Sequence, residues 1–140
     1  MAKTVLRISN DDEYDFLLIG IVCQQKDYRL CHELNHRLHL DLKRQKDYEI
    51  MNNKRMKTSA FPFFQYANKD KDVYNVFANK GKDDFLIPEQ RSIDFLLLIK
   101  ENFRRLIEQE LINAIKEIPI VLGAYSIEVK KLKSKENLIF

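Results

Sequence analysis

The amino-acid sequence predicts an α+β fold: a mixed β-sheet with two helices packed on one face. Hydrophobic residues make up 45% of the 140 positions, whereas glycine and proline occur only three times each, so the chain can form a core and has few turn-forming residues. A strand–helix–strand pattern is found near each end, and aromatic runs lie between the two. We therefore expect a single domain, residues 1–140, with a β-α-β-β-β-β-α-β order, a variant of the ferredoxin-like arrangement.

The first strand–helix–strand unit begins at residue 14. Residues 14–23 are almost continuously apolar and include β-branched side chains, which indicates a strand buried on both faces. Residues 27–38 place leucines at helical spacing, and Asp27 lies where the positive end of the helix dipole favours a carboxylate. Residues 38–44 alternate between apolar and polar side chains, which predicts a half-buried strand.

The middle of the chain changes from charged to aromatic. Residues 45–59 are polar and charged, so we expect a strand end followed by a mobile loop. Residues 60–67 and 72–78 are rich in aromatic residues and are separated by a four-residue polar spacer, which predicts a hairpin. Pro62 cannot donate a backbone hydrogen bond and therefore directs the first run to a sheet edge or a bulge.

The second strand–helix–strand unit follows Pro88. Residues 93–99 carry apolar side chains on both faces, which predicts a central strand. A helix over residues 88–117 is the alternative, because proline is accepted in a first helical turn.

In the strand interpretation, Asn102 is a candidate N-cap for a following helix, in which apolar residues recur at helical spacing from Phe103 onward. Pro119 ends this helix, and residues 120–129 predict a last strand that bends at Gly123.

Charge and cysteine usage bound the class of protein. The net charge is +3, and residues 41–82 carry ten Lys and Arg against five Asp and Glu, so the middle of the chain is basic. A basic middle fits an acidic partner, nucleic acid included, and equally fits a solvated face. Cys23 and Cys31 are the only cysteines, too few for a disulfide framework. Since no apolar run approaches the ~20 residues that span a bilayer, we expect a cytoplasmic protein with no membrane partner.

Few residues form a pattern typical of catalysis. No glycine-rich phosphate loop and no recognised nucleophile spacing is present, so we expect no enzymatic activity, no cofactor and no catalytic residue. His32 and His36 are four residues apart on the predicted helix and could bind a metal or small molecule if a third ligand joined them. Surface histidines on an amphipathic helix are the alternative, and we assign no metal ligand.

Two carboxylates, Glu89 and Asp94, are close together in sequence. They could act as an acid–base pair, although their spacing implies no particular geometry. The structural alternative is an ion pair or cap at the strand entry, in which Arg91 or Arg29 pairs with Asp94. We favour the structural interpretation.

Residues 54–82 combine aromatic rings with basic side chains, a combination that holds single-stranded RNA by stacking and phosphate contact. The alternative is that most of these rings belong to the core. The candidate RNA or partner surface comprises Lys54, Arg55, Lys57, Lys69, Lys71, Lys80, Lys82, Phe64, Tyr66 and Tyr74.

The C-terminal residues 130–140 form a basic tail with an apolar end. This tail either docks a partner or folds back on the domain, and the pattern favours neither. An edge strand of the predicted sheet offers a route to a homo-oligomer.

The motif Ile87-Pro88-Glu89, three residues, then Ile93-Asp94-Phe95 resembles the signature of the IPExxxVDY family of small, uncharacterised bacterial proteins. Ile93 and Phe95 stand where the signature has valine and tyrosine. Segments around Tyr28 and Tyr125, and the tail at 132–138, also look like the family, so the resemblance covers nearly the whole chain. It implies a bacterial cytosolic single domain and brings no activity or cofactor with it.

These patterns lead to one functional hypothesis and two alternatives. We expect a non-enzymatic binding or adaptor domain with a protein partner, in which the signature residues are structural. The first alternative is an RNA-associated protein that uses residues 54–82. The second is metal or small-molecule binding near His32 and His36.

Overall fold

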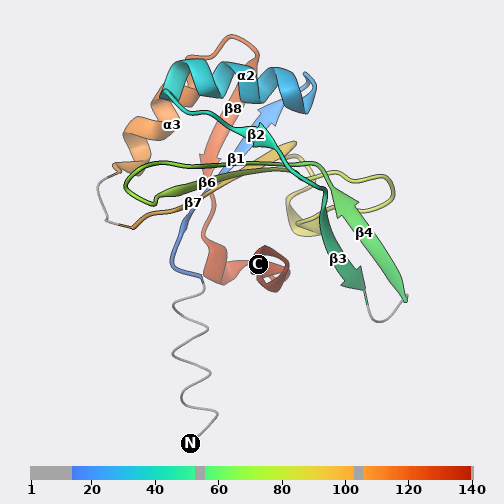
Figure 1. The fold of residues 1–140 in the computed structure, drawn as a ribbon. Coiled ribbons are helices and arrows are strands. Elements are labelled where there is room, and N and C mark those ends of the chain that lie inside the picture. Colours follow the sequence, from blue (N-terminus) through green and yellow to red (C-terminus); the bar gives the residue numbers. More distant parts are fainter. Residues whose placement is uncertain (1–13, 53–55, 103–105, 140) are drawn as a thin grey trace, which may run out of the picture.

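The computed structural model describes residues 14–52, 56–102 and 106–139. Within these ranges the chain forms a six-stranded sheet, a two-stranded sheet and two α-helices (Figure 1). The strands and helices are β1 (Leu17–Cys23), α2 (Asp27–Leu38), β2 (Lys43–Arg44), β3 (Tyr48–Asn52), β4 (Lys57–Phe61), β5 (Phe63–Ala67), β6 (Val73–Ala78), β7 (Phe95–Lys100), α3 (Glu108–Lys116) and β8 (Val121–Ser126). Three 3-10 turns are η1 (Pro88–Gln90), η2 (Val129–Lys131) and η3 (Lys135–Leu138).

The large sheet has the strand order β2-β5-β6-β7-β1-β8. Strands β6, β7, β1 and β8 with the two helices make a ferredoxin-like unit, which β5 and β2 extend at one side. The predicted α+β class is confirmed. The sheet itself is antiparallel rather than mixed, because β7 lies between β1 and β6 and pairs antiparallel with both.

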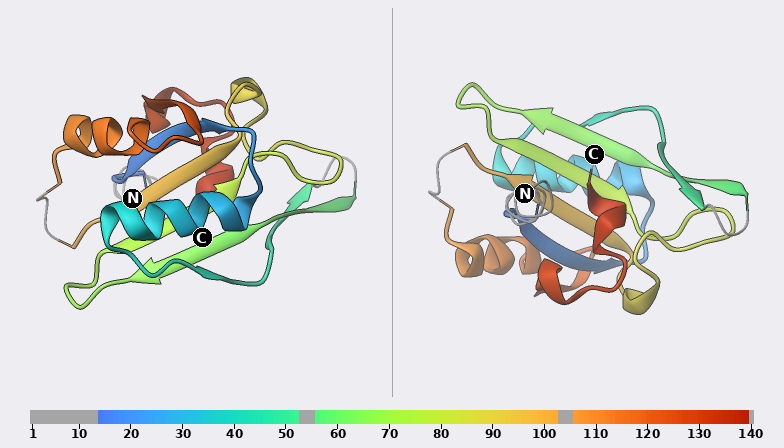
Figure 2. Two further views of the ribbon diagram at one scale, coloured as in Figure 1. Left: turned by 90° about the horizontal axis from the view of Figure 1, so that it is seen from above. Right: turned by 90° about the horizontal axis from the view of Figure 1, so that it is seen from below.

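The central strand β7 separates two apolar layers. Phe95, Leu97 and Ile99 face the layer that contains the helices, and Leu96 and Leu98 face the opposite layer. Figure 2 shows α2 and α3 on one face of the sheet and the C-terminal tail on the other. The prediction of a central strand is confirmed, and the alternative of a helix over residues 88–117 is wrong.

The prediction of a mobile loop at residues 45–59 is wrong for the residues that the structure describes. Here β3 and β4 pair as a hairpin, from Tyr48 opposite Phe61 to Asn52 opposite Lys57, which projects from the rest of the fold in Figure 1. Its base is held because Phe61 is buried and the Tyr48 ring contacts Phe77 edge-on, with the ring centroids 5.0 Å apart. Packing against the sheet therefore overrides the polar composition.

The strand that we expected over residues 38–44 is shorter in the structure, where only β2 (Lys43–Arg44) is a strand. His39 takes a left-handed conformation, φ 58°, that ends α2 at its predicted last residue. The Asn35 side chain then holds the following loop, since its Oδ1 accepts from the Leu42 N–H at 2.7 Å and its Nδ2 donates to the Leu42 carbonyl at 3.3 Å.

The second helix begins later than predicted. Its N-cap is Ile107 rather than Asn102, and Phe103 lies outside the described residues. The Asn102 backbone N–H instead donates to the Asp72 carboxylate at 2.7 Å, and its side chain donates to the Asp70 carbonyl at 3.0 Å. Asn102 therefore ties the end of β7 to the β5–β6 turn. Neither helix in the described part of the chain is long and apolar enough to cross a membrane.

Candidate functional site

The segment at residues 86–94, here called the signature turn, is held by one asparagine. Asn79 is fully buried at the end of β6, and its Oδ1 accepts from the Ile87 N–H at 2.8 Å. Its Nδ2 donates to the carbonyls of Gln90, at 2.8 Å, and Ile93, at 3.0 Å. Sequence reasoning missed Asn79, because an asparagine after an apolar strand reads as an ordinary loop start.

The described part of the C-terminal tail, residues 130–139, folds back onto the signature turn. The Glu89 carboxylate accepts from the Ser134 N–H at 2.9 Å and from the Ser134 hydroxyl at 2.6 Å. The Asn137 side chain donates to the Leu86 carbonyl at 2.9 Å, and Leu138 is fully buried. Of the two alternatives for the tail, the structure shows the tail folded back on the domain. Two segments that carry the family resemblance therefore contact each other.

Glu89 keeps its charge in this contact. Partial burial would raise the pKa of its carboxyl, but the hydrogen bonds from Ser134 and from nearby backbone N–H groups outweigh that effect and hold the pKa below its ordinary value. The ionised carboxylate therefore acts as an acceptor that fixes the tail.

Asp94 closes the end of β1. Its carboxylate accepts from the Cys23 N–H at 2.9 Å, and its backbone N–H donates to the Ile21 carbonyl at 3.0 Å. The expected cap is thus present, and its partner is a backbone group. Of the two arginines considered, Arg91 lies over the Phe85 ring and Arg29 pairs with Glu33. Glu89 and Asp94 each have a separate hydrogen-bond partner, and the expected arginines contact other residues.

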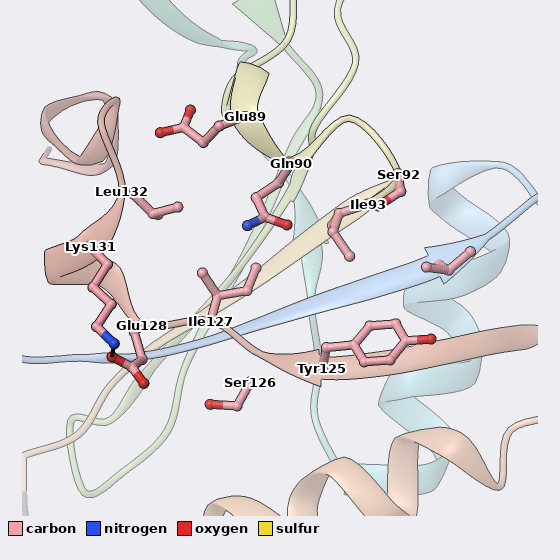
Figure 3. Close-up of a pocket in the computed structure, with 11 residues that line it drawn as sticks. Glu89, Gln90, Ser92, Ile93, Tyr125, Ser126, Ile127, Glu128, Lys131 and Leu132 are labelled. Atoms are coloured by element: carbon pink, nitrogen blue, oxygen red, sulfur yellow. Dashed lines mark ion pairs between the residues drawn. The ribbon is translucent and has the colours of Figure 1, made fainter.

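Between the signature turn and the tail lies a groove of about 680 Å³. It opens on the sheet face opposite the helices and borders β8. Figure 3 shows Gln90 and Ile93 on one side of it and Ile127, Glu128 and Lys131 on the other. The lining residues are Val22, Glu89, Gln90, Ser92, Ile93, Tyr125, Ser126, Ile127, Glu128, Lys131 and Leu132.

Gly20 permits the apolar floor of this groove. A Cβ added at Gly20 would lie 2.8 Å from the Ile93 Cδ1 and 2.9 Å from the Ile127 Cδ1. Because glycine has no side chain, the two isoleucines can approach each other above β1. Ile93 belongs to the signature, so this signature position shapes the groove.

The charged side chains that line the groove all have partners. Glu89 binds Ser134, and Glu128 and Lys131 form an ion pair at 3.0 Å. The remaining polar lining comes from neutral groups, Gln90, Ser92 and Ser126. The groove therefore combines an apolar floor with neutral hydrogen-bonding groups, and its size lies within the usual range of ligand sites.

The predicted RNA surface is only partly exposed. Phe64 and Tyr74 are buried against the helices, and Tyr66 is half-buried beside Tyr74, so none of these rings offers a free face for base stacking. Lys57 pairs with Asp83 at 2.9 Å, and this contact lowers the pKa of the Asp83 carboxyl. The exposed candidate lysines are Lys57, Lys69, Lys71, Lys80 and Lys82, and Lys54 and Arg55 lie outside the described residues. RNA binding stays a prediction that rests on lysines alone.

The other candidate groups show no shared site. His32 and His36 are exposed on α2, and no three His, Cys, Asp or Glu side chains come together as a metal site in the described ranges. Both cysteines are free and buried. Burial raises the pKa of the Cys31 thiol to about 12 and also raises that of Cys23, so both remain protonated near neutral pH and are weak nucleophiles.

Comparison of the chain with family models, with curated proteins and with solved structures found no match. The resemblance to the IPExxxVDY family therefore remains a prediction.

Proposed function

We propose that this chain is a non-catalytic binding domain that holds a short segment of a partner protein in the groove between the signature turn and the tail. The observation that carries the proposal is the composition of the groove. Its floor is apolar and its lining charges are already paired.

This composition favours a peptide over a charged small molecule. An aliphatic or aromatic side chain on Ile93 and Ile127 would gain roughly 1.5–3 kcal/mol from burial. Gln90, Ser92 and Ser126 offer neutral donors and acceptors that match the amide groups of a peptide backbone. A charged metabolite would find no unpaired countercharge among the lining residues.

The absence of catalysis belongs to the same proposal. The lining contains neither histidine nor cysteine, and the Glu89 carboxylate is committed to Ser134. The walls are pre-organised instead, since Asn79 holds the turn and Leu138 anchors the tail, and a rigid site lowers the entropy cost of binding.

We also assign this binding domain to the cytoplasm. Two buried cysteines without a disulfide support a reducing compartment.

A peptide-display selection with the purified chain tests the groove. We expect enrichment of peptides that carry one large apolar side chain. Ser92→Trp should abolish their binding, because Ser92 is an exposed lining residue and an indole there would fill the groove without replacing a core side chain. Thr58→Trp, on exposed β4 away from the groove, is the matched control and should bind like the parent chain. Equal binding by both variants, or no enrichment at all, contradicts the proposal.

A further inference from the structure

In the described part of the chain, strand β8 lies at one edge of the six-stranded sheet and pairs with β1 alone. It contains no charged residue over Val121–Ser126. Leu122 and Tyr125 are 66% and 54% exposed, although both are large side chains. Exposed, uncharged edge strands are templates for pairing with another strand, and proteins usually protect them with charges, proline or a covering element.

The register of β8 shows which backbone groups face outward. The Ile127 N–H donates to the Leu18 carbonyl at 2.9 Å, and Gly20 stands opposite Tyr125. Because facing residues alternate in an antiparallel ladder, Tyr125 bonds inward to β1, and the backbone groups of Ala124 and Ser126 point away from the sheet. A second strand can therefore bond to these outward groups without breaking an existing pair.

We propose that a second copy of this chain pairs antiparallel with β8, with the two-fold axis at Ala124, and joins two six-stranded sheets into one. This inference goes beyond the peptide-binding proposal, because it uses the backbone groups along the edge of β8, a strand whose Tyr125 and Ser126 also line the groove.

The register makes β8 complementary to itself. With Ala124 opposite Ala124, the regular part of the strand, Gly123–Ser126, supplies the new ladder, and Ser126 of one copy comes beside Leu122 of the other. Leu122 lies at a one-residue shift in the β1–β8 register, so the pairing at this end of the strand passes through a bulge. Tyr125 then falls opposite Gly123 of the second copy. The Tyr125 ring already lies across its own Gly123, where an added Cβ would be 2.6 Å from the tyrosine hydroxyl. The missing side chain at each Gly123 leaves room for the Tyr125 ring of the same copy, so that ring lies along its own strand.

The charges beyond the strand ends are paired within each chain. Antiparallel pairing brings the start of β8 in one copy beside the end of β8 in the other. Glu117 before the strand pairs with Arg37, and Lys131 after it pairs with Glu128, so these charges are already offset where the two copies meet. Within β8 no like charges oppose the pairing.

Cysteine cross-linking tests the register. Directly opposite residues have Cα atoms about 5.5 Å apart, which suits a disulfide. The double variant Leu122→Cys and Ser126→Cys should form a covalent dimer under mild oxidation, whereas each single variant should remain uncross-linked because its cysteines are offset along the strands. Dimers from the single variants, or none from the double variant, would overturn the proposed register.

Charge reversal tests the dimer itself by analytical ultracentrifugation across a wide concentration range. The variant Leu122→Lys with Ser126→Lys places lysines opposite each other and should weaken the dimer about tenfold, and Leu122→Glu with Ser126→Glu should do the same. Mixing the two should restore a heterodimer, which also shows that both variants fold. A parent chain that stays monomeric throughout, or a mixture that does not associate, overturns the dimer. Ser92→Trp should dimerise normally, so failure of the groove and failure of the edge give different results.

Discussion

The two edges of the large sheet differ in how they are protected. The β2 edge is two residues long, and both residues, Lys43 and Arg44, are exposed and charged. Arg44 also bonds Asp47 and lies 5.7 Å from the centre of the Phe64 ring. The β8 edge is six residues long, carries no charge and exposes two large side chains. The β2 edge is protected from pairing by its short length and its charges, whereas the β8 edge has neither protection.

The difference shows where this fold concentrates its binding surfaces. The groove, the signature turn and the docked tail all lie beside β8, and Tyr125 and Ser126 belong both to the edge strand and to the groove lining. The β2 side carries the strands that extend the ferredoxin-like unit. We therefore expect substitutions near β8 to affect binding and substitutions near β2 to leave it unchanged.

The largest expected effect comes from removing the anchor of the tail. Leu138→Ala should lower the free energy of unfolding by about 3 kcal/mol, because it leaves a cavity at a fully buried site, and it should also weaken peptide binding in the groove. Urea denaturation measures the first effect and peptide titration the second. Ile139→Ala, at a neighbouring side chain that is 37% exposed, should cost less than about 0.5 kcal/mol. Equal losses in the two variants would show that the tail does not depend on Leu138.

Loss of the asparagine that holds the signature turn should rank next. Asn79→Ala removes the hydrogen bonds to Ile87, Gln90 and Ile93 and should lower the unfolding free energy by about 2 kcal/mol. Asn113→Ala is the matched control, since that asparagine is exposed on α3. Unchanged stability of Asn79→Ala in urea denaturation would mean that the turn holds its shape without this side chain.

The contact between Glu89 and Ser134 should have a smaller effect that depends on pH. Because the folded-state pKa of Glu89 is lowered from 4.5, its stabilisation is present above that pH and is lost as pH falls through the lower folded value. Glu89→Gln should cost about 1 kcal/mol at neutral pH, after allowance for solvent screening. The variant and parent chain should converge in stability under acid conditions. A constant gap down to low pH would contradict the role of the carboxylate charge.

The smallest effect is expected at the β2 edge of the sheet. Lys43→Leu removes a charge from β2. It should leave the sedimentation of the dimer unchanged and should alter the free energy of unfolding by no more than about 0.5 kcal/mol. Leu122→Lys, the reverse exchange on β8, should likewise leave stability unchanged but weaken the dimer. Sedimentation of the two variants side by side makes the comparison, and a dimer lost in both would show that the edges are equivalent.

Local pattern accounts for much of the fold. The helix over residues 27–38, the strand ending at Cys23, the aromatic hairpin and the central strand all follow from apolar periodicity. The helix has the predicted bounds, whereas the first run of the hairpin is divided at Pro62 and the central strand begins at Phe95 instead of residue 93. These elements could be predicted because their spacing is contained within one segment of chain.

Contacts between distant segments decided the rest. Polar residues 48–61 form a hairpin because Tyr48 and Phe61 pack against the sheet, and Asn102 serves the β5–β6 turn rather than a helix cap. The candidate groove could not be predicted, because its walls are joined by Glu89 and Ser134, which are 45 residues apart.

By itself, the sequence determined the α+β class, the main strands and the first helix of this protein. Only the tertiary structure decided that the tail folds back on the domain, that Asp94 caps a strand across 71 residues and that β8 lies at the edge of the described sheet. The physical reason is that periodicity reports which side of an element is buried. It carries no information about which distant backbone group or side chain completes the contact, and that depends on packing of the whole chain.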